Sequence, residues 1–319
     1  MREEKVIVCR VAWGMLLLLL SLFPLPVFAS PFIYLTNSAE GTVSIIDIAT
    51  HRAVDPAIAV GSGPFGVALN PTGSRLYVTN LQSGTVSIID TSSNTSTGIE
   101  VRVGSEPSGI AIDRKGMRIY VANYGSDTVS VIDPIINEVT GFPITVERNP
   151  YGVALNPSGT RLYVSNQGSN TISVVDTTTN KVIESIPVGS LPQGMVVTPE
   201  GNLLYVVNAG SNSVLAIDTA TDKIIGQQIT VGMSPAAIAI NPEGTRLYVA
   251  NYASDDVSVI DTVSNKVIGS PIPVGHNPYA VMVNSSDTLV YVANRGSRTV
   301  SVIDVATSKV TETIPYGQK

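Results

Sequence analysis

The sequence predicts an all-β fold, a seven-bladed β-propeller built from four-stranded antiparallel blades. A motif of the form Tyr-x-x-Asn recurs at intervals of 42 or 43 residues, and Val fills its second place in six of seven copies. A repeat of this length is typical of propeller blades. Each repeat holds four short apolar segments separated by turn residues, with no helical period. This pattern indicates strands joined by tight turns rather than helices.

The repeats follow one another without a linker or a change in composition. The motif begins at Tyr34, Tyr77, Tyr120, Tyr163, Tyr205, Tyr248 and Tyr291. Ten residues after each motif Asn stands an acidic residue: Asp47, Asp90, Asp133, Asp176, Asp218, Asp261 and Asp304. Residues 30–319 are therefore predicted to form a single propeller domain.

One repeat shows how a blade is assembled. Residues 151–156 are expected to form strand A, 161–166 strand B, 171–176 strand C and 181–188 strand D. The intervening residues are rich in Pro, Ser, Gly, Asn and Thr. These residue types favour turns. A parallel β-helix would need a shorter repeat, and a helical solenoid would need segments with a period of 3.6.

The first and last repeats do not match each other. The chain enters at strand B of the first repeat and stops after strand D of the seventh, which gives six A strands and seven of each other kind. Either blade 1 lacks its inner strand, or this chain is shorter than its natural relative. The segment from the repeated Asp to the end of strand D is longer by a single residue in five repeats than in the other two. This difference predicts an extra residue, as a β-bulge, in five outer strands.

Residues 1–29 differ from the rest of the chain. Arg2, Lys5 and Arg10 precede an apolar stretch over 11–23, and Ala29 ends a run of small or apolar residues. This layout is that of a signal peptide, with cleavage expected after Ala29. An uncleaved anchor is the alternative, although the apolar stretch is short for one. The mature chain is expected to be exported, whether periplasmic, secreted or on the cell surface, and to have no membrane span.

The composition of the mature chain excludes several classes of function. Cys9, the only cysteine, lies in the leader. The mature chain therefore has no disulfide, thiol nucleophile or cysteine metal site. Removal of residues 1–29 takes away three basic and two acidic residues, which leaves 16 basic and 23 acidic residues and a net charge of −7. Nucleic-acid binding, which needs a basic stripe, is therefore not expected.

Four motifs recur in the same order in the repeats: Tyr-Val-x-Asn, Val-x-Val-Ile-Asp, Val-Gly-x-x-Pro and Asn-Pro-x-Gly. They resemble the YVTN repeat family of β-propellers, known from microbial surface-layer and other exported proteins. The resemblance covers residues 31–317, with local departures at Val146-Glu147 and at 284–287. It implies a propeller fold, secretion and often a cell-surface setting. It implies no single activity, because related propellers include both binding proteins and enzymes.

Residues that recur in every blade are predicted to be structural. Each Tyr is expected to pack between neighbouring blades while its hydroxyl finds a polar partner. Each Asn is expected to bond the turn after strand B, and each Asp to accept amides of the turn after strand C. A ring of Asp carboxylates that binds cations is a weaker alternative, because these residues head turns at the periphery. A ligand site must instead break the sevenfold symmetry.

The loops that vary most are expected to share one face of the ring. They are the loops from strand D to the next strand A (D–A loops) and the turns between strands B and C (B–C turns). The candidate binding residues there are Phe65, Glu106, Tyr124, Arg148, Asn149, Tyr151, Gln193, Tyr252, His276, Asn277, Tyr279 and Arg295. Aromatic rings among Asn, Arg and Gln side chains are typical of a recognition surface. Ordinary drift of loop sequence is the alternative explanation.

The chain offers little catalytic chemistry. It has two histidines, His51 and His276. They are expected on opposite faces, which excludes a multi-histidine metal site. No nucleophile elbow, P-loop or dinucleotide fingerprint is found. No catalytic residue, resident metal or cofactor is predicted. Ca²⁺ needs only oxygen ligands and is the one ion that the axis could bind, with Glu106 and Glu147 as the nearest candidate ligands.

Two hypotheses on function follow. The first is a non-catalytic binding scaffold that engages a protein or glycan partner at the cell envelope through the D–A loops and B–C turns. The alternative is a propeller enzyme, such as a lactonase or lyase, that uses His276 with Glu106 or Glu147 and Ca²⁺.

Overall fold

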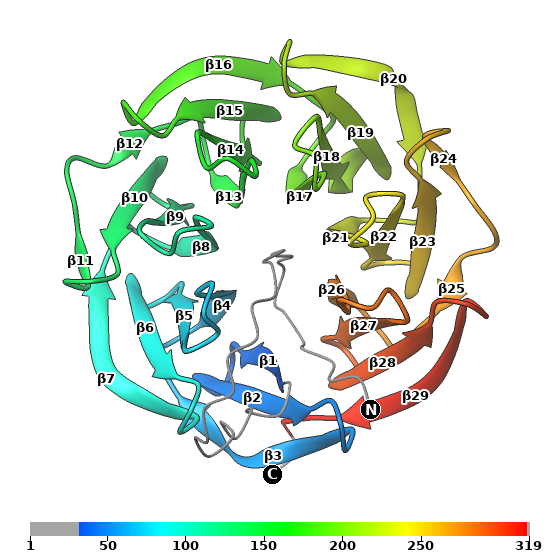
Figure 1. The fold of residues 1–319 in the computed structure, drawn as a ribbon, viewed down its shortest axis with the longest axis horizontal. Helices are drawn as coiled ribbons and strands as arrows, with labels where there is room; N and C mark the ends of the chain where they lie inside the picture. The colour runs from blue at the N-terminus through cyan, green and yellow to red at the C-terminus, as the bar shows by residue number, and fades with distance from the viewer. Residues whose placement is uncertain (1–31, 318–319) are drawn as a thin grey trace, which may run out of the picture.

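The computed structural model describes residues 32–317, and these form a ring of seven antiparallel sheets around a central axis (Figure 1). The predicted seven-bladed propeller is confirmed. Strand A of each complete blade lies next to the axis and strand D lies at the rim (Figure 1). The leader prediction for residues 1–29 lies outside the described residues. No helix within residues 32–317 has the length and apolar character needed to cross a membrane.

The strand bounds follow the repeat closely. Blades 1 and 2 comprise β1 (Phe32–Asn37), β2 (Thr42–Asp47), β3 (Arg52–Ala59), β4 (Pro64–Leu69), β5 (Arg75–Asn80), β6 (Thr85–Asp90) and β7 (Thr95–Arg102). Blades 3 and 4 comprise β8 (Pro107–Ile112), β9 (Ile119–Asn123), β10 (Thr128–Asp133), β11 (Glu138–Val139), β12 (Ile144–Thr145), β13 (Pro150–Leu155), β14 (Arg161–Asn166), β15 (Thr171–Asp176) and β16 (Lys181–Pro187).

The remaining three blades repeat the same order. Blades 5 and 6 comprise β17 (Pro192–Val197), β18 (Leu203–Asn208), the short 3-10 helix η1 (Ala209–Ser211), β19 (Ser213–Asp218), β20 (Lys223–Thr230), β21 (Pro235–Ile240), β22 (Arg246–Asn251), β23 (Asp256–Asp261), β24 (Lys266–Val267) and β25 (Ile272–Pro273). Blade 7 comprises β26 (Pro278–Val283), β27 (Leu289–Asn294), β28 (Thr299–Asp304) and β29 (Lys309–Pro315).

Blade 1 has three strands, and within the described residues it lacks an inner strand. In blades 2 to 4 the third residue of strand A is Gly, and a Cβ there would lie 2.5–2.6 Å from a carbonyl oxygen of the next inner strand. Blades 6 and 7 have Ala237 and Ala280 at this position, and Ala280, which precedes the blade without an inner strand, is exposed. Met282 packs against the blade 7–blade 1 interface, at a position where four other blades have Ala.

Seven buried clusters join neighbouring blades and form the core of the ring. The cluster between blades 7 and 1 contains Ile33 and Leu35 of β1 packed with Tyr291 and Ile314. The same interface is held at the surface by Arg298, which donates to Glu40 over 2.7 Å, and by the His51–Glu312 pair. Side-chain packing, rather than a strand shared by the two ends, therefore closes the ring within the described residues.

The outer strands depart from the expected pattern of five bulges. The longer repeats carry a bulge in β3, β7 and β20, but in blades 3 and 6 the outer strand is split into two short pieces. Pro143 and Pro271 lie at these breaks. Proline has no N–H to donate to the neighbouring strand. The strands β16 and β29, from the two shorter repeats, also carry bulges. The prediction is wrong for these four blades because repeat length alone does not show where a strand stops pairing.

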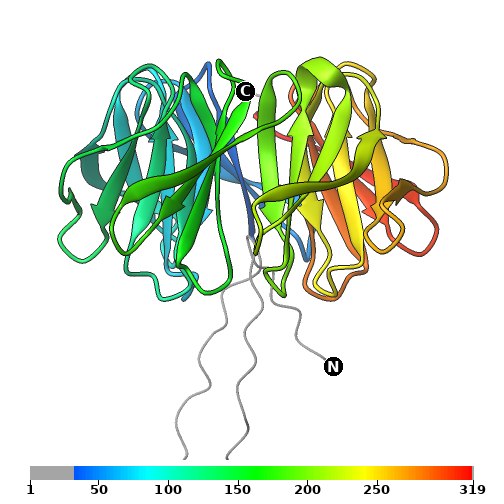
Figure 2. The same ribbon diagram turned by 90° about the horizontal axis from the view of Figure 1, so that it is seen from above.

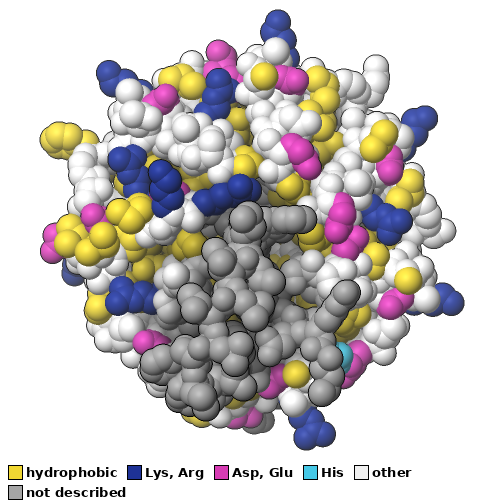
Figure 3. All heavy atoms as spheres, viewed as in Figure 1, with side chains coloured by type: hydrophobic (Ala, Val, Ile, Leu, Met, Phe, Trp, Pro, Cys, Tyr) yellow, Lys and Arg dark blue, Asp and Glu magenta, His cyan; other side chains and the backbone are white. Residues whose placement is uncertain are grey.

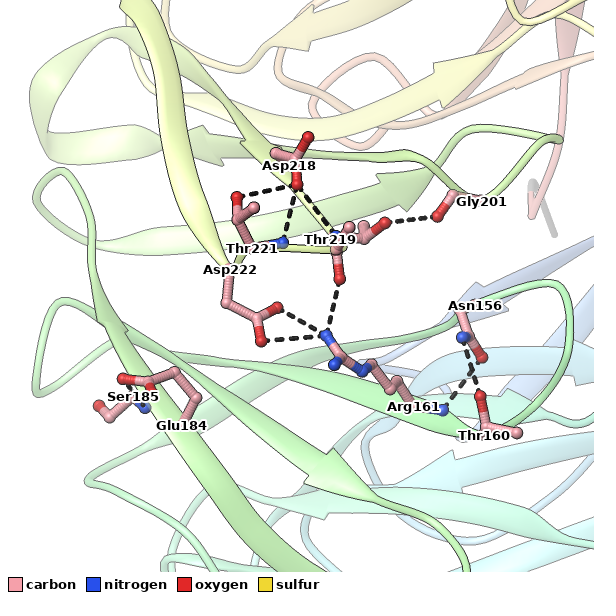
Figure 4. A network of polar contacts seen from close by, with 11 residues as sticks. Asn156, Thr160, Arg161, Glu184, Ser185, Gly201, Asp218, Thr219, Thr221 and Asp222 are labelled. Carbon is pink, nitrogen blue, oxygen red and sulfur yellow. Dashed lines mark hydrogen bonds and ion pairs between the residues drawn. The ribbon is translucent and has the colours of Figure 1, made fainter.

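The seven tyrosines are buried between neighbouring blades, as predicted. Tyr34 donates its hydroxyl to Asn94 of blade 2 over 2.8 Å, and Tyr205 donates to Asn265 of blade 6 over 2.8 Å. Burial raises the pKa of both phenols to about 12. Arg161 also links two neighbouring blades, 4 and 5. Its Nη1 donates to the Thr219 carbonyl over 2.7 Å and to Asp222 over 2.9 Å (Figure 4).

The motif Asn residues take a different partner from the expected one. In six blades the side-chain Nδ2 donates across to a Ser in the middle of strand C rather than to the turn. In blade 4, for example, Asn166 donates to Ser173 over 2.8 Å and to Thr171 over 3.1 Å. In blade 5 the Ser is replaced by Leu215, and neither amide atom of the fully buried Asn208 has a partner among the described residues.

The turn after strand C is capped by its Asp in every blade, as predicted. Asp176, for example, accepts the backbone N–H groups of Thr178 and Thr179 over 2.9 and 2.8 Å. Hydrogen bonds of this kind favour the carboxylate over the neutral acid. They lower the pKa of five such aspartates from the usual 3.8: Asp90, Asp176, Asp218, Asp261 and Asp304.

Acid should weaken these caps. A carboxyl group whose pKa is lower in the folded chain stabilises the fold above its unfolded pKa, and this stabilisation is lost as the pH falls through the folded pKa. We expect the stability to be flat above about pH 5 and to fall below about pH 4. Asp176→Asn should make the acid loss smaller, so urea midpoints of wild type and variant should converge as the pH falls. A constant difference between them down to about pH 2 would contradict this account.

Candidate functional site

One face of the ring carries the D–A loops and the B–C turns, and the other carries the A–B and C–D turns (Figure 2). We call the first the D–A face. On it, each B–C turn is tied to the adjacent D–A loop by a backbone bond, such as Tyr124 N–H to the Glu106 carbonyl at 3.0 Å and Arg295 N–H to the Asn277 carbonyl at 3.0 Å. The loops are therefore fixed, and the differences between blades lie in their side chains.

Three of the predicted binding residues, all aromatic, meet across the axis. Phe65, Tyr151 and Tyr279 occupy the second position of strands β4, β13 and β26. The Phe65 ring centroid lies 5.4 Å from that of Tyr151 and 5.8 Å from that of Tyr279, in edge-to-face geometry. The two tyrosine hydroxyls also hydrogen-bond to each other. Burial raises the pKa of both phenols. Truncation of either tyrosine should therefore also weaken the packing at the axis.

Tyr252 and Arg295 extend this group away from the axis. The Tyr252 ring centroid lies 6.3 Å from that of Tyr279, and the Arg295 guanidinium lies 6.0 Å from the Tyr279 centroid. Arg295 is exposed, whereas the rings are half-buried. We call these five residues the axial cluster: Phe65, Tyr151, Tyr252, Tyr279 and Arg295. It presents aromatic surface, phenol hydroxyls and one cation near the mouth of the ring.

Asn149 and Asn277 have a structural role. Both adopt the left-handed backbone conformation, with φ of 54° for Asn149 and 51° for Asn277. Asn tolerates this conformation better than most residues do. Their side chains donate to the carbonyls of Tyr124 and Tyr252, each over 3.2 Å. The Tyr124 hydroxyl in turn donates to Gln167 over 3.3 Å. The same arrangement of Asn and Tyr thus occurs in two loops that lie three blades apart.

His276 pairs with Asp255 of the neighbouring B–C turn, a residue that is not among the predicted binding residues. The His276 Nδ1 lies 2.8 Å from Asp255, and the two side chains are 78 % and 36 % exposed. The hydrogen bond from the backbone N–H of Asn277 lowers the pKa of Asp255 most, and the hydrogen bond with His276 lowers it further. Three repeats earlier, the equivalent of Asp255 is Asp127, which accepts the backbone N–H of Asn149 over 2.8 Å, as Asp255 accepts that of Asn277 over 2.7 Å. The Asp that stands 22 residues before each of these two Asn residues was the available sequence signal.

Glu147 does not join His276. Its carboxylate accepts hydrogen bonds from the hydroxyls of Thr171, over 2.8 Å, and Ser185, both in blade 4. The bond from Ser185 is the main cause of the lowered pKa of Glu147. Glu106 is exposed in a left-handed conformation with φ of 51°. It lines an open depression of about 470 Å³ together with Leu81, Gln82, Ser83, Gly84 and Ser105.

Gln193 and the carboxylates complete the set of candidates. Gln193 occupies the second position of β17 and is half-buried, and its Oε1 atom has no partner among residues 32–317. No three His, Cys, Asp or Glu side chains of residues 32–317 come together in a group that could hold a metal ion. Glu106 and Glu147 belong to no such group of three, and the Glu147 carboxylate is bonded to Thr171 and Ser185.

Two family models match parts of the chain. A model of seven-bladed β-propeller lactonases matches residues 176–274, and a model of the choice-of-anchor I domain matches residues 34–191. The search of curated proteins gave no match.

Three solved structures share the fold. A structure of hydrazine synthase from Kuenenia stuttgartiensis is 24 % identical to this chain, with a TM-score of 0.79. The match covers 86 % of this chain and 92 % of that chain. A functionally unknown protein from Desulfotomaculum acetoxidans is 17 % identical, with coverage of 89 % and 95 % and a TM-score of 0.76. The dihydro-heme d1 dehydrogenase NirN is 15 % identical, with coverage of 93 % and 67 % and a TM-score of 0.69. Family model and structure agree at the level of the fold: this chain is a seven-bladed β-propeller protein.

Proposed function

We propose that this protein is an exported recognition module that binds a protein or glycan partner through its D–A face. The observation that carries the proposal is the axial cluster, in which side chains from blades 2, 4, 6 and 7 converge on one side of the ring. Residues shared by all blades explain the scaffold. The axial cluster breaks that symmetry, and a site for an asymmetric partner requires such a break.

The chemistry of the axial cluster suits recognition. Tyr and Arg side chains contribute most to binding surfaces, because they bury a large area and still offer hydrogen bonds. Arg295 is exposed and Tyr252 is half-buried, so both can reach a partner without unfolding a loop. The backbone bonds between D–A loops and B–C turns hold them in place. A loop that is already ordered loses less entropy on binding.

The position of His276 favours binding over catalysis. A general base works best where water is excluded and a second group stands opposite the substrate. The His276 side chain is largely exposed, lies 2.8 Å from Asp255, its one side-chain partner among residues 32–317, and is not among the residues that line the depression beside Glu106. The setting proposed for the module is the cell envelope. The leader-like residues 1–29, the YVTN-like repeats and the choice-of-anchor match support that setting.

A binding titration tests the proposal. The envelope component captured by the wild-type protein is purified and titrated against Tyr252→Ala/Arg295→Ala. We expect the dissociation constant to rise by about 30-fold or more, because hot-spot truncations cost about 2 kcal/mol or more. Neither side chain is fully buried, so the urea midpoint should change little.

Matched variants on the opposite face serve as controls. Ser158→Ala and Thr178→Ala alter exposed residues of an A–B and a C–D turn and should leave the dissociation constant unchanged. If these variants lose affinity while the double variant keeps it, the partner binds the other face and the proposal is wrong.

A lactone hydrolase is the second candidate, favoured by the match of residues 176–274 to the lactonase model and by the His276–Asp255 pair. In that case His276 would take a proton from attacking water while Asp255 orients its ring. A panel of aliphatic and aromatic lactones is the test. Hydrolysis that His276→Ala abolishes, with the fold intact, would replace the recognition proposal. We expect the wild type and His276→Ala to give the same rate of lactone hydrolysis, equal to the rate without protein.

A further inference from the structure

The first strand of blade 1 has an unpaired edge at the axis of the ring. β1 pairs with β2 on one side, and no other strand of residues 32–317 pairs with it. In the six other blades the equivalent edge is covered by an inner strand. These inner strands pack side by side around the axis (Figure 1): β4, β8, β13, β17, β21 and β26. Within the described residues, this ring of inner strands has one gap, at blade 1 between β26 and β4.

The backbone of blade 2 shows which groups of β1 face this gap. The Asn70 N–H donates to the Arg75 carbonyl over 2.9 Å, so Arg75 turns its backbone groups toward the inner strand. Because alternate residues of an antiparallel strand pair on the same side, Tyr77 and Thr79 do so too. Their equivalents in blade 1, 43 residues earlier in the chain, are Phe32, Tyr34 and Thr36. Unpaired N–H and C=O groups in such a row are a template for a further strand.

β1 has the residues of a central strand rather than those of an edge strand. Edge strands are commonly blunted by a charged side chain, a Pro or a β-bulge. Phe32–Asn37 contains neither charge nor Pro, and its register with β2 is unbroken. Tyr34 is 7 % exposed, whereas its equivalent Tyr77 in blade 2 is 1 % exposed. Leu35 is 8 % exposed, whereas Val78 is fully buried. The inner side of β1 is therefore less well covered than that of β5, and nothing in its sequence opposes pairing.

Thr36 has one side of a shared contact vacant. In blade 2 the Thr79 hydroxyl donates to the Ser108 carbonyl of the next blade over 2.7 Å and accepts the Gly66 N–H of its own inner strand over 2.8 Å. In blade 1 the Thr36 hydroxyl donates to the Phe65 carbonyl of blade 2 over 3.0 Å. No group of residues 32–317 takes the place of the Gly66 N–H there. A strand that paired with β1 would supply that N–H.

The inner strands of the other blades define the third residue of a strand that fits. This residue is Gly in four of them and Ala in two. A Cβ at Gly66 would lie 2.5 Å from the Ser108 carbonyl oxygen. The Phe65 carbonyl holds the same place beside blade 1, as its bond from Thr36 shows. Gly is therefore the residue that fits opposite Thr36.

Three further positions restrict the sequence of such a strand. The fourth and sixth residues of all six inner strands are apolar. In blade 1 they would lie opposite Leu35 and Ile33, the equivalents of their partners in blade 2. The second residue must be small, because the ring centroids of Phe65 and Tyr279, from the two strands that flank the gap, lie 5.8 Å apart. Ser108 of blade 3 is such a residue.

A second copy of the chain offers no free segment of this kind among residues 32–317, because all six inner segments are paired within their own blades. Figure 3 shows the face with the A–B and C–D turns, where Lys and Arg side chains are interspersed with Asp and Glu side chains around the ring. No single sign of charge therefore selects the segment. Backbone pairing and the size of its side chains select it instead.

We propose that an extended segment of a partner protein completes blade 1 by pairing with β1 as its inner strand. The segment runs antiparallel to β1, as the inner strands of the other blades run to their neighbours. Its Gly lies opposite Thr36, and two apolar residues lie opposite Leu35 and Ile33. In this mode of recognition the main-chain hydrogen bonds give affinity and the fit of alternate side chains gives specificity. The inference does not depend on the partner proposed for the D–A face.

A peptide tests the inference. The probe is a fluorescein-labelled peptide with the sequence of residues 105–114, which spans β8 and has a small second residue. We expect saturable binding to the purified protein, measured by fluorescence anisotropy. Gly109→Val in the peptide should weaken binding about tenfold or more, because the added side chain would meet the Phe65 carbonyl. Ala111→Pro should weaken it to a similar extent, because Pro lacks the N–H that pairs with Tyr34.

Two variants of the protein form a matched pair. Thr36→Val removes the hydroxyl that would accept the N–H of the Gly in the segment, so peptide binding should weaken about fivefold or more. Thr36→Ser keeps the hydroxyl and should bind the peptide as wild type does. Blade 4 has a serine at this position, and Ser165 there accepts the Gly152 N–H over 2.9 Å.

Hydrogen exchange shows where the peptide binds. Amides of residues 32–37 should exchange about tenfold or more slowly with the peptide bound, whereas the paired amides of residues 75–80 should not change. No binding by wild type, equal binding of the Gly109→Val peptide, or protection at the D–A loops in place of residues 32–37 would overturn the proposal. So would self-association that the peptide reverses, because a second copy would then supply the strand. Wild type and variants contain the same residues 1–29, so any effect of the leader cancels.

Discussion

Tyr163→Ala should lower the free energy of unfolding by about 3–5 kcal/mol, the range for truncation of large aromatic side chains in protein cores. Tyr163 is fully buried and packs between its own blade and blade 5, against Ile172 and Ile186 on one side and Leu204 and Val206 on the other. Its loss leaves a cavity at an interface between blades, and rigid sheets on both sides limit any collapse into it. Urea titration followed by far-UV circular dichroism measures the change.

Tyr252→Ala is the matched control for this prediction. It removes the same side chain from a half-buried position on the D–A face. The substitution should cost about 1 kcal/mol or less, as for most surface substitutions. If Tyr163→Ala and Tyr252→Ala unfold at the same urea concentration, the repeated tyrosines are not interior packing. The division between repeated scaffold and variable site would then lose its basis.

Asn166→Ala should cost about 2–3 kcal/mol, whereas Asn208→Ala should cost about 1 kcal/mol or less. Asn166 donates to Ser173 over 2.8 Å and to Thr171 over 3.1 Å, so its removal leaves a buried hydroxyl without its donor. Asn208 is equally buried, but its amide atoms have no partner among the described residues because Leu215 replaces the serine. The two substitutions remove the same atoms from the same position in neighbouring blades.

This pair of variants isolates the hydrogen bond from the volume change, because both variants leave a cavity of similar size. Differential scanning calorimetry of both proteins at neutral pH gives the comparison. A loss for Asn208→Ala as large as that for Asn166→Ala would show that packing, rather than the bond to Ser173, explains why the motif ends in Asn.

The candidate site was predicted in part from the sequence. Phe65, Tyr151 and Tyr279 were identified because they break the repeat at a loop position, and the structure brings these three together. Their contact across the axis links blades 2, 4 and 7, and no sequence pattern within one repeat contains that information. The pairing of His276 with Glu106 or Glu147 was not found, because the turn geometry places Asp255 beside His276 and directs Glu147 to Thr171.

The sequence by itself determined the number of blades, the order of strands within each and the capping role of the repeated Asp residues. These features are local: a period of 42 or 43 residues, alternation along strands and Asx turns all lie within one repeat. Only the tertiary structure decided how Asn166 bonds across to Ser173, where the rims of blades 3 and 6 break, and which side chains meet at the axis. These features depend on distances between strands and blades, which a linear repeat does not encode.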